Sequence, residues 1–263
     1  WSKHVCRCHP VVCRFESHFF LLNERRNVGN DPVYGFVQVE GFDNISSMTT
    51  MLAIETSGAL CSLAIWRDQE RFEDTRNVDR MHNQVVLEML DALTRRAQVA
   101  PQDFEVVGFG AGPGSFTGVR IAATVAQSVA LAASAVAVPV SSSLALLTAV
   151  KPTEDKVLVT TRSRGDAYYI AGYSRQDTGW ELVVPDALHG SWPTELLHHD
   201  WICVGDRPSW EAVGGAPPWR GAGNVNASHI AELAMVEFES GRACGPAEAL
   251  PRYVGGDTPW RPV

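Results

Sequence analysis

A glycine-rich turn between an apolar strand and a helix of small residues constrains the fold of this chain more than any other segment. Val106 and Val107 begin a β-branched run typical of the end of a buried strand, and glycines follow at 110, 112 and 114. Glycine adopts positive φ and lets another backbone approach closely. Residues 119 to about 133 predict a helix that is uncharged from residue 121 on, and such a helix is buried in a core or against a partner. The segment therefore predicts a strand–turn–helix unit.

The same turn offers a candidate anion site, for which Gly112, Gly114, Ser115 and Thr117 are the residues. Ser115 or Thr117 can cap the helix, and free N–H groups at a helix start bind phosphate or carboxylate. No Gly-Lys-Ser/Thr follows, so the turn is not a P-loop. An architectural turn and an anion cradle both remain open. In either case we expect Gly112 and Gly114 to hold backbone angles that a β-carbon would resist.

A second segment narrows the fold. Residues 51–57 predict a strand ending in a polar turn, and residues 58–66 return as a second strand. The strings Leu-Ala-Ile-Glu-Thr-Ser, Arg-Met-His-Asn-Gln and Ala-Gly-Pro-Gly-Ser-Phe-Thr-Gly-Val-Arg occur in that order from about residue 51. With these motifs the chain resembles the TsaB (YeaZ) family, the bacterial partner of the TsaD threonylcarbamoyltransferase. The resemblance is strong to about residue 140 and weaker beyond.

The resemblance implies an α/β, two-domain actin-like (ASKHA, ribonuclease H-like) fold with mixed sheets flanked by helices. We predict a first domain at 48–150 and a second at 151–263, divided at the polar linker 151–156. The implied function is that of a non-catalytic subunit supporting N6-threonylcarbamoylation of adenosine 37 (t6A) in tRNAs that read ANN codons. The implied partners are a TsaD-type transferase and a TsaE-type ATPase, with a homodimer also open.

The family pairs with TsaD through two helices of the first domain, which correspond here to residues 80–93 and 115–133. Methionine, valine and leucine on the first helix suit adaptable apolar contact, and small residues on the second permit close packing. The predicted partner-binding residues are Arg80, Met81, His82, Val85, Met89, Leu93, Thr117, Val119, Ile121, Val125, Ala126 and Val129.

Catalytic groups expected of a TsaD-type enzyme are missing from the sequence. TsaD carries a His-x-x-x-His metal pair where this chain has Ser142 and Leu146, and no glycine-pair adenosine loop follows. Two histidines one turn apart bind a metal because both rings fall on one helix face. No other set of catalytic or metal-binding residues is predicted. The run His198-His199-Asp200 is interpreted as a solvated turn and not as a metal site. The alternative functions are an M22-type (glycoprotease) peptidase and a small-molecule kinase or ATPase. The resemblance implies no cofactor, although weak ATP or ADP binding stays open.

Charge and composition limit the partners. The net charge is −8, and all of it arises from residues 48–263. Because phosphate contacts dominate nucleic-acid affinity, an acidic body binds tRNA only through a complex. The most apolar stretch, 121–140, is interrupted by polar residues, so no membrane span is expected. Scattered Cys61, Cys203 and Cys244 suit reduced thiols and a cytoplasmic location.

Residues 1–47 differ from the remainder. They hold Cys6, Cys8 and Cys13 but no methionine, and Met48 and Met51 are the first start-like residues. The cysteines lack a second ligand pair at zinc spacing. We interpret 1–47 as a non-native or disordered extension.

Hydrophobic periodicity predicts the remaining elements. These are helices at 79–97, 142–149 and 227–241, strands at 136–140, 157–161, 167–173 and 201–206, and a loop at 208–223. No internal repeat is visible in the sequence.

Overall fold

The structure, a computed structural model, describes residues 49–254 except 79–80, 178, 198–199 and 211–213. The predicted extension 1–47, with its cysteines, lies outside the described residues. Arg80, His198 and His199 lie outside them as well.

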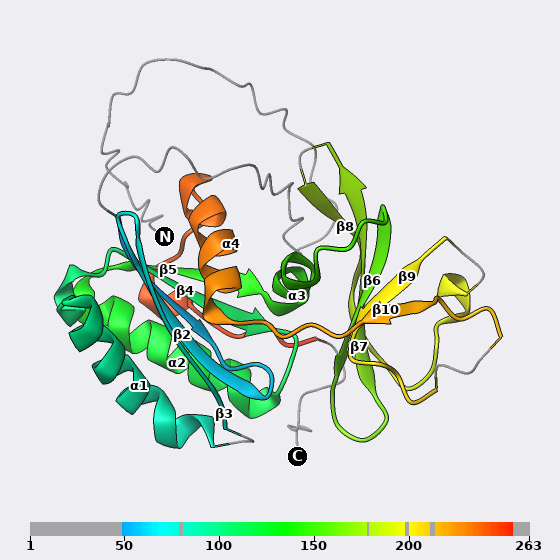
Figure 1. Ribbon diagram of the computed structural model, residues 1–263, viewed down its shortest axis with the longest axis horizontal. Helices are drawn as coiled ribbons and strands as arrows, with labels where there is room; N and C mark the ends of the chain where they lie inside the picture. The colour runs from blue at the N-terminus through cyan, green and yellow to red at the C-terminus, as the bar shows by residue number, and fades with distance from the viewer. Residues whose placement is uncertain (1–48, 79–80, 178, 198–199, 211–213, 255–263) are drawn as a thin grey trace, which may run out of the picture. The chain divides into compact units, whose positions relative to one another are not determined.

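Five strands form the first sheet, in the order β3-β2-β1-β4-β5 (Figure 1). β1 pairs antiparallel with β2 and parallel with β4, while β3 and β5 are the edges. The strands are β1 (Thr50–Glu55), β2 (Leu60–Arg67), β3 (Glu70–Asn77), β4 (Val106–Gly112) and β5 (Val136–Ser141). The predicted hairpin and the strand before the glycine turn are thereby confirmed.

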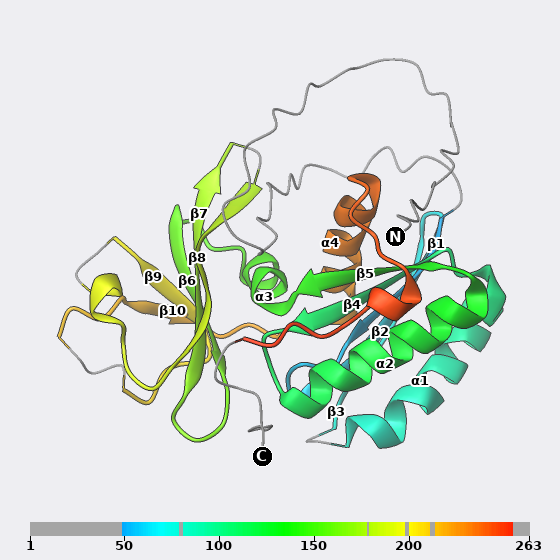
Figure 2. The ribbon, with the colours of Figure 1, turned by 180° about the vertical axis from the view of Figure 1, so that it is seen from behind.

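Helices cover both faces of this sheet. Every residue of β1 is buried, and since alternate side chains of a strand point to opposite faces, both faces must be covered. Leu52 and Ile54 pack under α1 (His82–Ala97) and α2 (Phe116–Ala133). Met51 and Ala53 pack under α4 (Ala227–Glu239). Figures 1 and 2 show α1 and α2 on one side of the sheet and α4 on the other.

The second sheet has the order β10-β9-β6-β7-β8. β6 pairs antiparallel with β7 and parallel with β9, as β1 pairs with β2 and β4. Taken from β8, the order repeats that of the first sheet. The strands are β6 (Lys156–Arg162), β7 (Tyr168–Gln176), β8 (Gly179–His189), β9 (Ile202–Gly205) and β10 (Trp219–Gly221). Two mixed sheets with this repeated order confirm the predicted actin-like, ribonuclease H-like fold class.

The second sheet packs α3 (Ser142–Val150) on one face. Its other face carries a cluster around Trp192, with Trp201, Trp210 and Trp219 packed against it. The short 3-10 helices are η1 (Pro101–Asp103), η2 (Thr194–Leu196) and η3 (Pro246–Glu248). The predicted loop at 208–223 contains β10, so that prediction was wrong at its end.

One helix departs from the predicted boundary between residues 150 and 151. α4 belongs to the range 151–263, yet Ile230 and Ala234 are buried against the first sheet. The chain thus crosses back after β10 because the apolar face of α4 covers the otherwise open side of β1 and β4. The division at 150/151 does not describe where α4 packs.

α2 begins at Phe116, three residues earlier than the predicted start at 119. By length and composition α2 is the one helix of the described residues apolar enough to cross a membrane. A single such helix is weak evidence for a membrane span, because core helices of globular proteins pass the same test. The alanine-rich face of α2, at 122, 123, 126 and 130, packs in the core of the first sheet. Burial against β4 accounts for the absence of charge in this helix from residue 121 to 133.

Candidate functional site

The glycine turn is packed against the tip of the β1–β2 hairpin. Gly112 has φ +106°, as expected, but Gly114 does not have a positive φ, so the expectation for Gly114 was wrong. Gly114 is instead required by close approach, since a Cβ there would lie 2.7 Å from the carbonyl oxygen of Ser57. The N–H of Ser115 donates to that same oxygen at 2.7 Å. The turn therefore joins two backbone segments.

Several donors of the turn are used within the chain. Ser115 caps α2, because its hydroxyl accepts from the N–H of Gly118, whereas Thr117 lies inside the helix and does not cap it. The N–H of Gly112 donates to the hydroxyl of Ser142 at 3.2 Å. An anion would have to displace these bonds, which favours the architectural interpretation of the turn.

A buried carboxylate lies beside the turn. Glu55 is 1% exposed and accepts hydrogen bonds from the N–H of Ser57 and from the hydroxyl of Ser142. Burial raises the pKa of Glu55, although the hydrogen bonds from Ser57 and Ser142 oppose that rise. A Cβ on Gly110 would overlap the carboxylate. Within the described residues no basic side chain forms an ion pair with Glu55.

Glu55 borders a cavity of about 150 Å³. Ser142 and Leu146, the counterparts of the TsaD histidine pair, both line it, as does Asp206. The described residues of its wall include two carboxylates and no lysine, arginine or histidine, so their charge disfavours phosphate. The described residues contain no group of three or more histidine, cysteine or acidic side chains placed to hold a metal.

Another polar cluster, for which the sequence offered no signal, joins α3 to the second sheet. The hydroxyl of Ser143 donates to Asp186 at 3.1 Å and lies 2.8 Å from the hydroxyl of Tyr173. Oδ1 of Asp186 has no hydrogen-bond partner in the described part of the chain. Burial raises the pKa of Asp186 to about 6, while Ser143 and the charge of Arg252 oppose the rise.

A groove of about 490 Å³ runs along α1 and α2 and is here called the helix groove. Leu87 of α1 is 64% exposed beside it, although leucine is usually buried. Exposed apolar surface of this kind marks an association site. The lining residues are Asn83, Val86, Leu87, Phe116, Thr117, Arg120, Ile121, Thr124, Val125, Ser128 and Val129.

Four of the predicted partner-binding residues line this groove: Thr117, Ile121, Val125 and Val129. Met81 is exposed and Val85 is half-buried, but neither lines it. The others described are buried and do not line the groove: His82, Met89, Leu93, Val119 and Ala126. Arg120 of α2 and Asn83 and Leu87 of α1 also line the groove and were not among the predicted residues. Asn83 and Leu87 were missed because the sequence pattern does not say which side of α1 faces the sheet.

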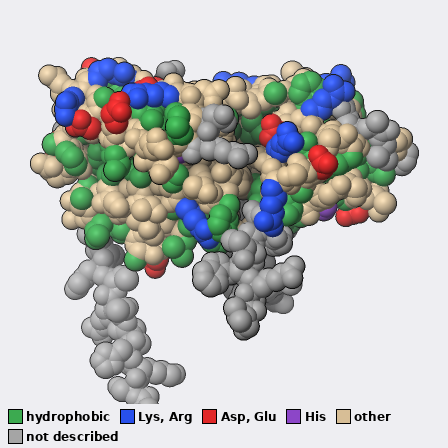
Figure 3. All heavy atoms as spheres, turned by 90° about the horizontal axis from the view of Figure 1, so that it is seen from below, with side chains coloured by type: hydrophobic (Ala, Val, Ile, Leu, Met, Phe, Trp, Pro, Cys, Tyr) green, Lys and Arg blue, Asp and Glu red, His purple; other side chains and the backbone are tan. Residues whose placement is uncertain are grey.

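Charges elsewhere on the surface are mixed. On the face in Figure 3, lysine and arginine side chains of the described residues are interspersed with acidic, hydrophobic and uncharged ones. This distribution, with the net charge of −8, provides no basic stripe on that face for the phosphates of a nucleic acid.

The repeated sheets and the helix groove define an actin-like protein with a surface suited to association. Comparisons with known proteins agree. Residues 76–190 match the family model of TsaD, tRNA N6-adenosine threonylcarbamoyltransferase. The tRNA threonylcarbamoyladenosine biosynthesis protein TsaB of Escherichia coli K12 is 26% identical over 225 residues, covering 80% of this chain and 96% of that protein.

TsaB of Buchnera aphidicola subsp. Schizaphis graminum is 30% identical over 166 residues, covering 59% of this chain and 78% of its own length. The solved structure of YeaZ from Pseudomonas aeruginosa has a TM-score of 0.66 at 26% identity and covers 79% of this chain and 100% of that one. The chain belongs to the TsaB family.

Proposed function

We propose that this protein is a non-catalytic subunit in the synthesis of threonylcarbamoyladenosine at position 37 of tRNA. It pairs with a TsaD-type transferase in the cytoplasm, and a TsaE-type ATPase joins the pair. Membership in the TsaB family supports the pathway. The acidic charge supports a role in which the partner holds most of the tRNA.

The observation that carries the proposal is the helix groove. Its walls are mostly apolar and come from α1 and α2, the two helices for which pairing is expected. Leu87 and Ile121 lie on opposite walls and remain accessible. Covering them with an apolar helix removes this surface from water, the main driving force of association.

The cavity beside Glu55 gives less support to a kinase. It lacks a cationic side chain for phosphate, and the N–H of Gly112 is already bonded to Ser142. These contacts favour a scaffold role for the glycine turn.

Co-purification with TsaD tests the proposal. We expect wild type to bind TsaD, and Leu87→Asp or Ile121→Asp to abolish binding, because each places a charge in an apolar interface. Val183→Asp on β8 is the matched control, since Val183 is also exposed, at 45%, but belongs to the second sheet. Unchanged binding by both groove variants would refute the assignment. Light scattering shows whether a second copy occupies the groove instead.

A further inference from the structure

One charged side chain stands in the otherwise uncharged wall of the helix groove. Among the described residues that line it, Arg120, on the second turn of α2, is the only charged one. Within the described residues no carboxylate forms an ion pair with Arg120. The first turn of α2 also lacks an acidic residue, so the positive end of the helix dipole adds to the same potential.

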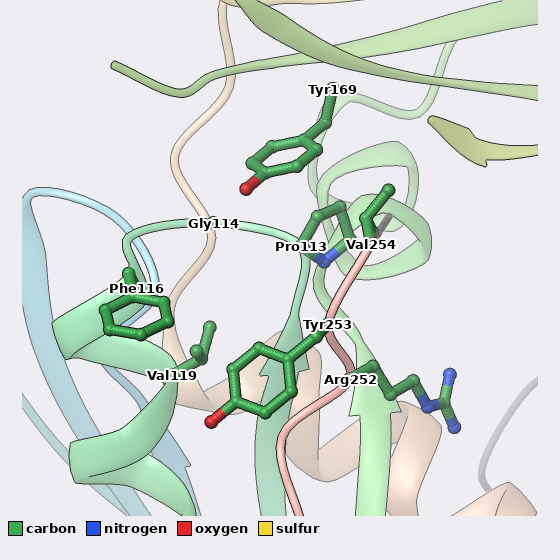
Figure 4. A pocket seen from close by; sticks show the side chains of 8 residues that line it. All are labelled: Pro113, Gly114, Phe116, Val119, Tyr169, Arg252, Tyr253 and Val254. Carbon is green, nitrogen blue, oxygen red and sulfur yellow. The ribbon is translucent and has the colours of Figure 1, made fainter. Parts of the chain in front are cut away.

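The guanidinium of Arg120 is held in place by two aromatic rings. Its central carbon lies 3.4 Å from the ring centroid of Phe116 and 5.3 Å from that of Tyr253. Its Nε donates to the hydroxyl of Tyr253 at 2.8 Å. Figure 4 shows Tyr253 pointing from the C-terminal segment toward Phe116 and Val119, while Arg252 points away from them. The C-terminal segment thus fixes the orientation of Arg120.

This orientation leaves the two terminal nitrogens of Arg120 for an external acceptor. Nε is used by Tyr253, and no further hydrogen bond of Arg120 occurs within the described residues. The terminal nitrogens form a planar fork that matches both oxygens of a carboxylate. Stacking on rings also reduces the entropy lost on binding, because the side chain is already ordered.

A purely apolar helix is therefore a poor occupant of the groove. It would cover Arg120 and remove water from a cation without an ion-pair partner among the described residues, which opposes binding. A helix that brings a carboxylate to the Phe116 end satisfies the charge and fills the apolar wall.

Resting on the proposed function, we infer that the TsaD-type partner presents an apolar helix with an aspartate or glutamate, which forms a bidentate ion pair with Arg120. The pair fixes where along the groove the partner helix sits. It also discriminates against helices that lack the acid.

The test is the dissociation constant for TsaD across about 50 to 500 mM NaCl. We expect Arg120→Met to weaken binding by about 30-fold or more at low salt and to flatten the salt dependence. Arg120→Lys keeps the charge but loses the fork, so it should bind less tightly than wild type and retain the salt dependence. Arg220→Met on β10 changes charge equally on the second sheet and should match wild type.

Two further measurements separate the possible failures. Thermal melts establish whether each variant is folded. If Arg120→Met does not fold, the comparison of Arg120→Lys with wild type tests the inference instead. Asp257→Asn tests whether the chain's own acid, outside the described residues, pairs with Arg120; a flattened salt dependence in that variant would overturn the inference. If wild type binds TsaD and Arg120→Met has the same dissociation constant and the same salt dependence, the inferred ion pair is overturned. The proposed function then stays intact. Failure of wild type to bind TsaD would overturn both.

Discussion

Gly110 leaves the space that the carboxylate of Glu55 occupies. Glu55 ends β1 and Gly110 lies in β4, its parallel neighbour. Any β-carbon at 110 would overlap Oε2 of Glu55. The buried acid and the glycine are therefore one packing unit.

Gly110→Ala should destabilise the protein by about 1–3 kcal/mol, because the added methyl group overpacks the site. Gly58→Ala is the matched control, since a Cβ there meets nothing within 4 Å. Urea unfolding measures both. In a double-mutant cycle, Glu55→Ala should offset part of the cost of Gly110→Ala. Strict additivity would show that the two residues are not coupled.

Gly114→Ala should lower stability by about 1–3 kcal/mol through the clash with Ser57, whereas Gly190→Ala, in open space, should not. If the turn is architectural, ATP or ADP leaves the wild-type melting temperature unchanged. A saturable rise with nucleotide that Gly114→Ala loses would instead identify a phosphate site.

Asp186 should make stability fall as pH rises. Burial lifts its pKa from the model-compound value of 3.8 to about 6, so the folded state binds the proton more tightly than the unfolded state. Stability from this group is full below about pH 4, declines through pH 6 and stays low above it. Asp186→Asn should remove the decline, worth up to about 3 kcal/mol. Parallel pH profiles for wild type and variant would contradict the assignment.

Two residues of α1 should respond oppositely to truncation. Met89→Ala should cost about 2–5 kcal/mol, because Met89 is fully buried under the helix. Leu87→Ala should change stability within about 0.5 kcal/mol, because Leu87 is exposed. Yet Leu87→Ala should weaken TsaD binding at full stability. Similar unfolding midpoints for both variants would show that the buried face of α1 is misplaced.

Local signals predicted the central elements well. The apolar runs on either side of the polar turn at 56–58 predicted the β1–β2 hairpin, and Ser115, one of the two candidate caps, does cap α2. Capping and periodicity are properties of neighbouring residues, which is why they can be recognised without tertiary contacts.

The buried face of α1 was harder to predict. Val85 and Val86 are adjacent, so the apolar pattern fits two stripes that differ by one residue. The sheet selects the stripe through Val86, Met89 and Leu93, which leaves Val85 half-buried. Only contact with β2 and β3 decides between the two.

β8 and the repeated strand order were also missed. β8 is half-buried along most of its length, so its alternation is weak. The two sheets share an order of strands but not a visible sequence repeat, because topology requires matching patterns of burial and connection, not matching residues.

β3 has a consequence for how copies of this protein meet other chains. It forms an edge of the first sheet, and five of its eight side chains are charged. An edge strand with so many charges resists pairing with a strand from another molecule. The charges on β3 therefore disfavour extension of the first sheet at this edge, and with it aggregation by strand pairing. Association is left to side-chain recognition on helices, which can be reversed and tuned one residue at a time.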